Sequence, residues 1–292
     1  MNFDNIKGKA FSNIEIGPYT TFKIGGKVKN LVLCEDIEDL KTVIKICKEE
    51  QKEVFVLGAG SNILFKSDEH DLVVIKLTGK DFSNIFEKDN VLTVGAGMSL
   101  SQTILFSAAK GLKGLEIFAG IPATVGGAVY MNAGSDKWIC SFIKKVILMD
   151  MEGNLFEVTK KQLNPVYRSS GLKNNIILQV EFELEKDLPE NVMCQYKKIL
   201  ENKKDIQPID KNSAGCVFKN PDLQGISAGK IIDECGLKGF TKGGAEVSSK
   251  HANFIVNQNN ASFEDVLFLI KKIKEVVKKN KNIELEMEII IV

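Results

Sequence analysis

Short apolar runs of strand length alternate with amphipathic segments of helix length along this chain, and that alternation restricts it to a mixed fold. The runs "VFVLG" from Val54 and "NIILQVEFEL" have the length and the Val, Ile and Phe content of buried strands. The segment "DIEDLKTVIKICKEE" instead places Ile37, Leu40 and Ile44 at helical spacing, behind the helix-capping residue Asp36. The pattern predicts the α+β class.

The expected elements fall into three blocks, which we predict as domains 1–78, 79–187 and 188–292. The first block contains a β-α-β unit, and "KDLPEN" marks the last boundary. Ser262 and Asp265 stand at capping-box spacing at the start of the most amphipathic segment. Further expected strands cover residues 30–34, 72–77, 91–97, 145–150, 155–158, 251–257 and 283–292, and further expected helices cover residues 99–111, 192–204, 227–236 and 261–280.

Charge and composition exclude several classes of protein. The 39 basic and 38 acidic side chains nearly cancel, so we expect no nucleic-acid partner. No apolar run reaches the ~18 residues of a membrane span, and the start "MNFDNIKGKAFSN" does not look like a signal peptide. We therefore expect a cytoplasmic protein without a membrane partner, with six reduced cysteines. With only two histidines, no metal site is expected.

Arg168, in "NPVYRSSG", is the only arginine in the chain, in which every other strong base is a lysine. A guanidinium offers a planar fork of donors that matches a carboxylate or phosphate, which a lysine ammonium cannot do. The alternative is a structural ion pair, because buried charges also serve structure.

The loop "GAGSN" follows an expected strand directly. Its glycines allow a ligand to approach the backbone, and successive N–H groups can bind a pyrophosphate. It lacks the third glycine and the following helix of the dinucleotide fingerprint, so an ordinary strand-ending turn stays open as an alternative. Its residues are Gly58, Ala59, Gly60, Ser61 and Asn62.

The stretch "AGIPATVGGAVYMNAG" is rich in small residues and would make a poor core. We expect its backbone to lie against a flat, polar cofactor, whereas the alternative is close packing of small residues against another strand. The candidate residues are Ile121, Pro122, Ala123, Thr124, Gly126, Gly127, Ala128 and Asn132.

Two further segments carry groups that can exchange protons. Cys216 lies in "NSAGCVFKNP", and a thiol, whose reference pKa is about 8.5, passes a proton more readily than an alkyl hydroxyl. Most cysteines outside disulfides are inert, however. In "IELEMEIIIV", Glu284, Glu286 and Glu288 occupy every second position, so all three lie on one face of an expected strand. The alternative is an ordinary solvent-exposed face on which none of the three has a special role.

Several segments, taken together and in order, closely resemble the UDP-N-acetylenolpyruvoylglucosamine reductase family. They are "YTTFKIGG", "VLGAGSNILF", "GIPATVGGAVYMNAG", "YRSSG", "SAGCVFKNP", "SAGKIID", "HANFIVN" and the final Leu-x-x-Glu-Ile. The resemblance runs from about Thr20 to Ile289. It implies a two-part FAD-binding domain of the PCMH type followed by a smaller α+β substrate-binding domain. It also implies a cytosolic flavoenzyme of peptidoglycan synthesis that uses FAD and NADPH to reduce UDP-N-acetylglucosamine enolpyruvate. We expect this enzyme to be a monomer.

The resemblance assigns roles to particular residues. It implies that Arg168 and Glu288 are catalytic and that Cys216 donates the proton, at a position where the family more often has serine. Glu288 either hydrogen-bonds the substrate carboxylate when protonated or orients Arg168 when ionised. The short interval between Arg168 and Cys216 resembles the shorter form of the family, which lacks an extra loop with a tyrosine. The expected contacts to the sugar diphosphate are Lys204, Lys219 and Asn220, since lysine binds phosphate as a point charge.

Two other functions fit parts of the same pattern. One is an alcohol oxidase with the same FAD-binding architecture. Such enzymes often attach FAD through histidine, and neither His70 nor His251 lies in a motif for that link. The other is a nucleotide-sugar binding protein without catalysis, which the presence of Arg168, Cys216 and Glu288 disfavours.

Overall fold

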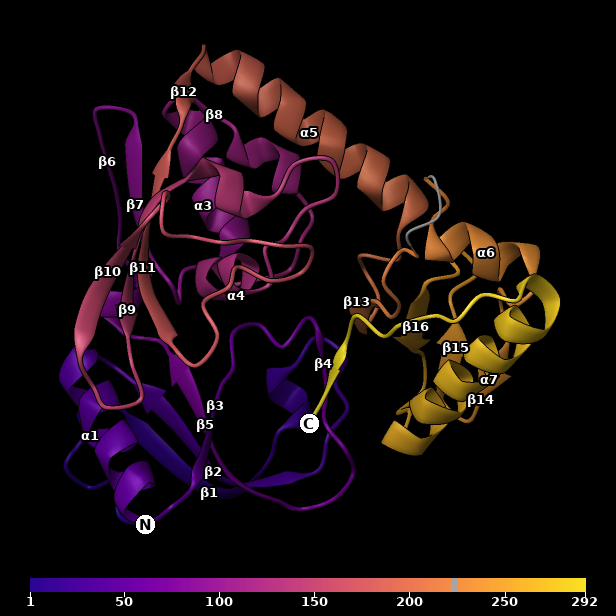
Figure 1. Ribbon diagram of the computed structural model, residues 1–292, viewed down its shortest axis with the longest axis horizontal. Helices are drawn as coiled ribbons and strands as arrows, with labels where there is room; N and C mark the ends of the chain where they lie inside the picture. The colour runs from indigo at the N-terminus through magenta and orange to yellow at the C-terminus, as the bar shows by residue number, and fades with distance from the viewer. Residues whose placement is uncertain (222–224) are drawn as a thin grey trace. The chain divides into compact units, whose positions relative to one another are not determined.

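The computed structural model describes residues 1–221 and 225–292, and helices are interspersed among the strands along them (Figure 1). The helices are α1 Ile37–Glu49, α2 Lys80–Ser83, α3 Leu100–Ala109, α4 Val125–Tyr130, α5 Pro189–Ile206, α6 Ala228–Glu234 and α7 Phe263–Lys281. The strands are β1 Lys9–Glu15, β2 Lys27–Cys34, β3 Glu53–Val56, β4 Ile63–Leu64, β5 His70–Leu77, β6 Ile85–Lys88, β7 Val91–Gly95, β8 Leu112–Lys113, β9 Ile143–Met149, β10 Leu155–Thr159, β11 Ile176–Glu183, β12 Glu185–Lys186, β13 Ser213–Cys216, β14 Thr241–Lys242, β15 Ala245–Val247, β16 Phe254–Asn257 and β17 Ile290–Ile291. This mixture confirms the predicted α+β class.

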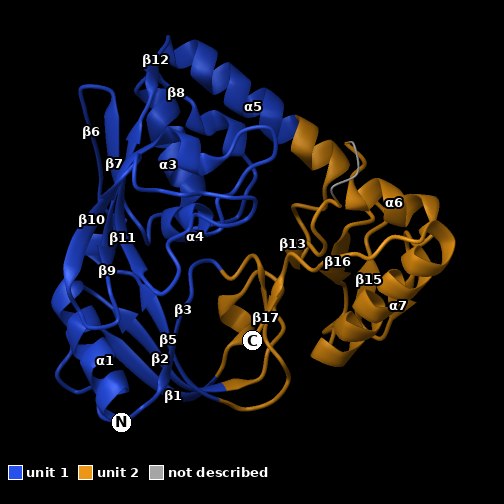
Figure 2. Ribbon diagram, viewed as in Figure 1, with its two compact units in different colours: residues 1–14, 28–59, 71–201 blue, residues 15–27, 60–70, 202–292 orange. Residues whose placement is uncertain are grey.

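The chain forms two compact units, each assembled from separate stretches of sequence (Figure 2). Unit 1 contains residues 1–14, 28–59 and 71–201, and unit 2 contains residues 15–27, 60–70 and 202–292. The division into domains 1–78, 79–187 and 188–292 stays a prediction, because compactness alone does not separate the first two blocks.

A four-stranded sheet and α1 build the first part of unit 1 (Figure 1). The strand order is β1-β2-β5-β3, and β3 runs parallel to β5 with Val54 opposite Val73. The Asp36 carboxylate accepts a hydrogen bond from the Asp39 N–H at 2.9 Å, which confirms the predicted cap of α1. Leu40 and Ile44 of α1 pack with Val73 and the other side chains of one buried cluster, so the helix covers this sheet.

The second sheet of unit 1 is antiparallel, in the order β10-β9-β11-β7-β6. Its predicted strands are confirmed, including the hairpin of β9 and β10. Helices α3 and α4 lie on one face of this sheet (Figure 1). There Leu100, Val125 and Val129 are buried against Val180 and Phe182, so this core fixes the position of the glycine-rich stretch.

Helix α4 was not predicted, because two of its six residues are the poor helix formers Gly126 and Gly127. Tertiary contacts supply what the local sequence lacks. The Thr124 hydroxyl accepts a hydrogen bond from the Gly127 N–H at 3.2 Å and caps the helix. Gly126 donates to the Ala96 carbonyl at 2.8 Å, and a Cβ on Gly126 would lie 2.9 Å from the Ala96 Cβ. Gly126 therefore packs closely against Ala96, as the alternative to a cofactor contact expects, and its predicted contact with a cofactor stays a prediction.

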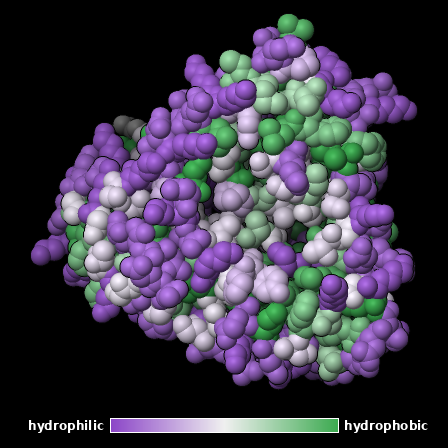
Figure 3. All heavy atoms as spheres, turned by 180° about the vertical axis from the view of Figure 1, so that it is seen from behind, coloured by the Kyte–Doolittle hydropathy of each residue, from purple (hydrophilic) through white to green (hydrophobic). Residues whose placement is uncertain are grey.

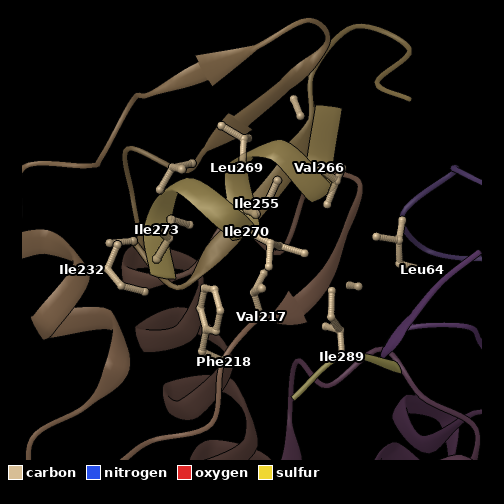
Figure 4. Packing of buried hydrophobic residues seen from close by; sticks show 14 of the residues in the cluster. Leu64, Val217, Phe218, Ile232, Ile255, Val266, Leu269, Ile270, Ile273 and Ile289 are labelled. Atoms are coloured by element: carbon tan, nitrogen blue, oxygen red, sulfur yellow. The ribbon is translucent and has the colours of Figure 1, made fainter. Parts of the chain in front are cut away.

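Unit 2 contains the sheet β13-β16-β15-β14 with α6 and α7 (Figure 1). Both predicted helices are confirmed, and Ser262 and Asp265 form the predicted capping box of α7. Figure 4 shows side chains of α7 packed with those of β16 and of the segment that follows β13. The labelled residues are Leu64, Val217, Phe218, Ile232, Ile255, Val266, Leu269, Ile270, Ile273 and Ile289.

The predicted strand over residues 283–292 is wrong in most of its length. Only Ile290–Ile291 forms a strand, which pairs in parallel with β4. Upstream of it, Met287 forms one antiparallel bridge with Phe218. The backbone partner of this segment thus changes within a few residues. Its side chains therefore do not alternate between the two faces of one continuous strand.

The face of the molecule in Figure 3 is largely polar. On the face in Figure 3, hydrophilic side chains cover much of the area, and hydrophobic atoms occur in several separate groups. No helix within residues 1–221 and 225–292 combines the length and the apolar character needed to cross a bilayer.

Candidate active site

Arg168 lies in a tight hairpin of unit 1. Val166 and Ser169 exchange two backbone hydrogen bonds, of 2.8 and 3.1 Å, so Tyr167 and Arg168 form the turn. The φ of Arg168 is +59°, in the left-handed region that glycine or asparagine adopts most readily. A side chain held there carries roughly 1–3 kcal/mol of backbone strain, which surrounding contacts must offset. The only arginine of the chain therefore stands where the backbone disfavours it.

The Arg168 guanidinium is half-buried and held by three groups of unit 1. Its Nη1 donates to the Gly134 carbonyl at 2.7 Å. The guanidinium carbon lies 4.9 Å from the centre of the Tyr167 ring and 5.4 Å from that of Trp138. The two rings are perpendicular, with their centres 5.4 Å apart. Sequence reasoning singled out the arginine but neither ring; the one tryptophan of the chain was the signal available.

Asn132 joins the arginine hairpin to the glycine-rich stretch. Its side-chain amide donates to the Val166 carbonyl at 3.0 Å, and its oxygen accepts from the Cys140 N–H at 3.2 Å. Asn132 is buried, with a φ of +44°. These contacts give the residue a structural role, and its predicted contact with a cofactor stays a prediction.

The two glycine segments meet at one hydroxyl group of unit 1. A Cβ on Gly58 would lie 2.6 Å from Thr124 Oγ1, the same atom that caps α4. On the other side of the loop, the Lys76 ammonium donates to the Gly58 carbonyl at 2.5 Å. The backbone after β3 is thus fixed between a lysine and a helix cap.

The small residues of these segments fit a flat, polar cofactor. Gly58, Ala59 and Gly127 are half-buried and carry nothing larger than a methyl group, so a ligand can approach their backbone. Of the other candidates, Ile121, Ala123 and Thr124 are half-buried and Pro122 is exposed, whereas Gly126 and Ala128 are buried. The accessible members fit FAD, while for the two buried ones a contact with the cofactor stays a prediction.

The rest of the first glycine loop belongs to unit 2. Gly60 has a φ of +66°, and a Cβ there would lie 2.8 Å from the Thr20 Cα. Thr21 Oγ1 donates to the Ser213 carbonyl at 2.7 Å and to the Gly60 carbonyl at 3.3 Å. Glycine at position 60 is therefore required by the turn itself. Ser61, next in the loop, is half-buried.

Cys216 and Glu288 are linked through the backbone of unit 2. The Glu288 N–H donates at 2.8 Å to the carbonyl of Val217, the residue after Cys216. Val217 and Ile289 are buried in the core of this unit (Figure 4), and Asn62 donates to the Glu288 carbonyl at 3.1 Å. Both candidate side chains are half-buried. The segments that carry Cys216 and Glu288 are thus hydrogen-bonded to each other, and the buried neighbours of the two residues hold both segments in place.

The alternating glutamates have different surroundings. Glu284 is exposed and pairs with Lys278 at 2.9 Å, which lowers the pKa of Glu284. Glu286 is exposed and pairs with Lys219. Glu288 is the half-buried one, so the position that the family resemblance picked differs from its two neighbours.

The candidate substrate contacts lie on exposed or half-buried parts of unit 2. Lys204 is exposed, and its carbonyl accepts from the Lys250 ammonium. The Asn220 side chain accepts from the Ala228 N–H at 3.0 Å, at the start of α6. Burial lowers the pKa of Lys203, which sequence reasoning missed. The available signal was its place in the apolar stripe of α5, which also contains Tyr196 and Leu200.

No three His, Cys, Asp or Glu side chains of residues 1–221 and 225–292 come together in a way that could hold a metal ion. Within the same residues, none of the cysteines is in a disulfide bond.

Comparison with known proteins decides the family. The "FAD binding domain" family matches residues 28–159, and the "UDP-N-acetylenolpyruvoylglucosamine reductase, C-terminal domain" family matches residues 207–292. A protein of Bacillus pumilus named UDP-N-acetylenolpyruvoylglucosamine reductase is 35% identical over 289 residues, which cover 98% of this chain and 94% of that one. A Clostridium botulinum protein of the same name is 37% identical over 283 residues, covering 96% and 92%.

This chain belongs to the UDP-N-acetylenolpyruvoylglucosamine reductase family.

The fold agrees with that family. The crystal structure of the UDP-N-acetylenolpyruvylglucosamine reductase from Thermus caldophilus superimposes with a TM-score of 0.84 at 33% identity, covering 98% of this chain and 99% of that one. The predicted membership of the UDP-N-acetylenolpyruvoylglucosamine reductase family and the predicted FAD-binding domain are confirmed. The predicted roles of single residues stay predictions.

Proposed function

We propose that this protein reduces UDP-N-acetylglucosamine enolpyruvate to UDP-N-acetylmuramate in peptidoglycan synthesis, with NADPH as the electron donor. Family membership over nearly the whole chain supports this reaction. FAD, when bound, would supply the hydride chemistry between NADPH and C3 of the enolpyruvyl group. The small residues Gly58, Ala59, Thr124 and Gly127 would hold it.

Arg168 binds the substrate carboxylate and stabilises the charge that develops during reduction. A hydride added to C3 leaves an electron pair at C2, delocalised onto the carboxylate. A fixed guanidinium can meet that charge with two parallel hydrogen bonds. The observation that carries this proposal is the strained backbone of the only arginine, whose side chain is held by a carbonyl and two rings.

Cys216 donates the proton that completes the reaction. The S–H bond breaks, the proton forms the C–H bond at C2, and the thiolate takes a proton back from water. Glu288 acts on the same substrate, and its backbone bond to Val217 supports this pairing of roles. Lys204, Lys219 and Asn220 bind the sugar diphosphate, with Lys219 exchanging its ion pair with Glu286 for phosphate.

The direct test is NADPH oxidation by the purified yellow holoenzyme with and without UDP-N-acetylglucosamine enolpyruvate. Oxidation that depends on this substrate and forms UDP-N-acetylmuramate is expected. A rate that the substrate does not change would refute the proposal.

Cysteine variants test the proton donor. Cys216→Ala should retain flavin reduction by NADPH and lose reoxidation by the enolpyruvyl substrate, whereas Cys216→Ser should keep substantial activity. Cys194→Ala is the matched control, because Cys194 is exposed on α5. Near-normal reoxidation of the Cys216→Ala enzyme would remove the thiol from the mechanism.

A further inference from the structure

The contacts of Arg168 include one side chain that no comparison assigns a role. Trp138 is half-buried and places its ring 5.4 Å from the guanidinium carbon. Tyr167 approaches the same group to 4.9 Å but is 40% exposed and belongs to the hairpin that carries the arginine. Trp138 comes from a different loop, so its ring ties that loop to the guanidinium.

The loop that carries Trp138 is built to hold the ring in place. Gly134 and Trp138 form an antiparallel bridge, and a Cβ on Gly134 would lie 2.0 Å from the Lys137 carbonyl. The Trp138 carbonyl accepts from the Ser141 N–H at 3.0 Å and from its hydroxyl at 2.6 Å. The Gly134 carbonyl, in turn, accepts from Arg168 Nη1. One five-residue loop therefore supplies both a hydrogen-bond acceptor and an aromatic face to the guanidinium.

We propose that Trp138 is a positioning residue that holds the Arg168 guanidinium in the orientation needed during reduction of the enolpyruvyl substrate. An arginine side chain has many rotamers, and contacts from a carbonyl and two perpendicular rings leave it few of them. A guanidinium fixed before substrate binds needs little reorganisation when charge develops. The inference rests on the proposed role of Arg168.

The test compares variants of the FAD-bound enzyme in its two half-reactions. Trp138→Phe keeps an aromatic face, while Trp138→Leu and Trp138→Met keep only apolar volume. Stopped-flow absorbance measures flavin reduction by NADPH and, separately, reoxidation by saturating enolpyruvyl substrate. Phe106→Leu is the matched control, because it removes another half-buried ring of unit 1 that lies near a cation, Lys110, at 5.8 Å.

Loss of the aromatic face should slow reoxidation and leave flavin reduction unchanged. The expected slowing for Trp138→Leu and Trp138→Met is about threefold to thirtyfold, the rate equivalent of one cation–π contact. Trp138→Phe should recover most of the rate, and Phe106→Leu should match wild type in both half-reactions. Equal rates for Trp138→Phe and Trp138→Leu, or reoxidation within twofold of wild type in every Trp138 variant, would overturn the inference.

An Arg168 background separates this inference from the proposed function. If Arg168→Ala slows reoxidation strongly, Trp138→Leu should add nothing further to it, because the ring would have no guanidinium to position. Equal slowing by Trp138→Leu in both backgrounds would assign the ring a general packing role and refute the positioning role alone. Normal reoxidation in Arg168→Ala would instead refute the proposed role of Arg168, and the inference with it.

Discussion

Replacement of Gly58 by alanine should destabilise the protein only while Thr124 keeps its hydroxyl group. The added Cβ would lie 2.6 Å from Thr124 Oγ1, whereas ordinary contacts begin near 3.4 Å. The next atoms, Thr124 Cβ and Cγ2, lie at 3.7 and 3.8 Å, so no other threonine atom clashes. The single hydroxyl oxygen therefore decides the outcome of the substitution.

The expected free energies follow from that one contact. The hydroxyl must swing away and give up its bond to the Gly127 N–H, and loss of such a helix cap costs about 1 kcal/mol, up to about 2 kcal/mol. A glycine-to-alanine change without strain stabilises by about 0.4–1 kcal/mol, through the unfolded chain. Gly58→Ala should therefore destabilise wild type slightly but stabilise the Thr124→Ala variant, with a coupling of about 1–2 kcal/mol.

Chemical denaturation of the wild type, both single variants and the double variant would measure this coupling. Each unfolding curve should be followed by tryptophan emission and by circular dichroism, since a chain of two units need not unfold in one step. FAD retention during gel filtration would report whether the displaced loop still holds the cofactor. Strictly additive free energies in the four proteins would refute the reasoning that one oxygen separates the two segments.

Three further outcomes test the site and its surroundings. Arg168→Lys should slow reoxidation by the enolpyruvyl substrate roughly a hundredfold or more while leaving FAD bound, because the charge stays and the fork is lost; a rate within about twofold of wild type in stopped flow would contradict this. Burial, with the Lys238 charge in support, lowers the pKa of His251 below its usual value of about 6.5, so the unfolded chain binds the proton more readily. Stability should therefore fall as the pH drops below about 6.5, and thermal melts should show a weaker fall in His251→Gln but not in the control His70→Gln. Burial raises the pKa of the Cys34 thiol to about 12, so iodoacetamide should label the exposed Cys194 before Cys34. Peptide mass spectrometry would measure the order of labelling, and faster labelling of Cys34 would mean that the core of unit 1 opens.

Elements whose signals are local were predictable from the sequence. Helix α1 begins behind Asp36, and α7 begins at a capping box, because both caps lie within the segment they start. Helix α4 was missed because its stability comes from Ala96 and from the core beneath it, which no local pattern records. The terminal strand was overextended because its partner changes along the run.

Residues of the candidate site were likewise predictable where the signal is in the sequence itself, and not where it depends on tertiary contacts. Arg168 could be singled out because its residue type is unique in the chain. Trp138 could not be linked to it, since the two residues lie 30 positions apart in the sequence and only tertiary structure brings them together. Lys204 was predicted as a phosphate contact from the charge of its side chain, whereas the burial that distinguishes Lys203 from it depends on tertiary structure.

The parallel pairing of β4 with β17 has a consequence for the order of events during synthesis. Asn62 leaves the ribosome 226 residues ahead of its partner Glu288, and at about 5–20 residues per second this delay is about 11–45 seconds. During that time, residues 60–70 cannot make their native backbone contacts with the C-terminal segment. Strand β4, which lacks its partner during this time, contains only Ile63–Leu64. It is too short to offer a neighbouring chain a long edge for incorrect pairing. The short length of β4 thus limits aggregation of the nascent chain before β17 is synthesised, whereas a longer unpaired strand would favour aggregation.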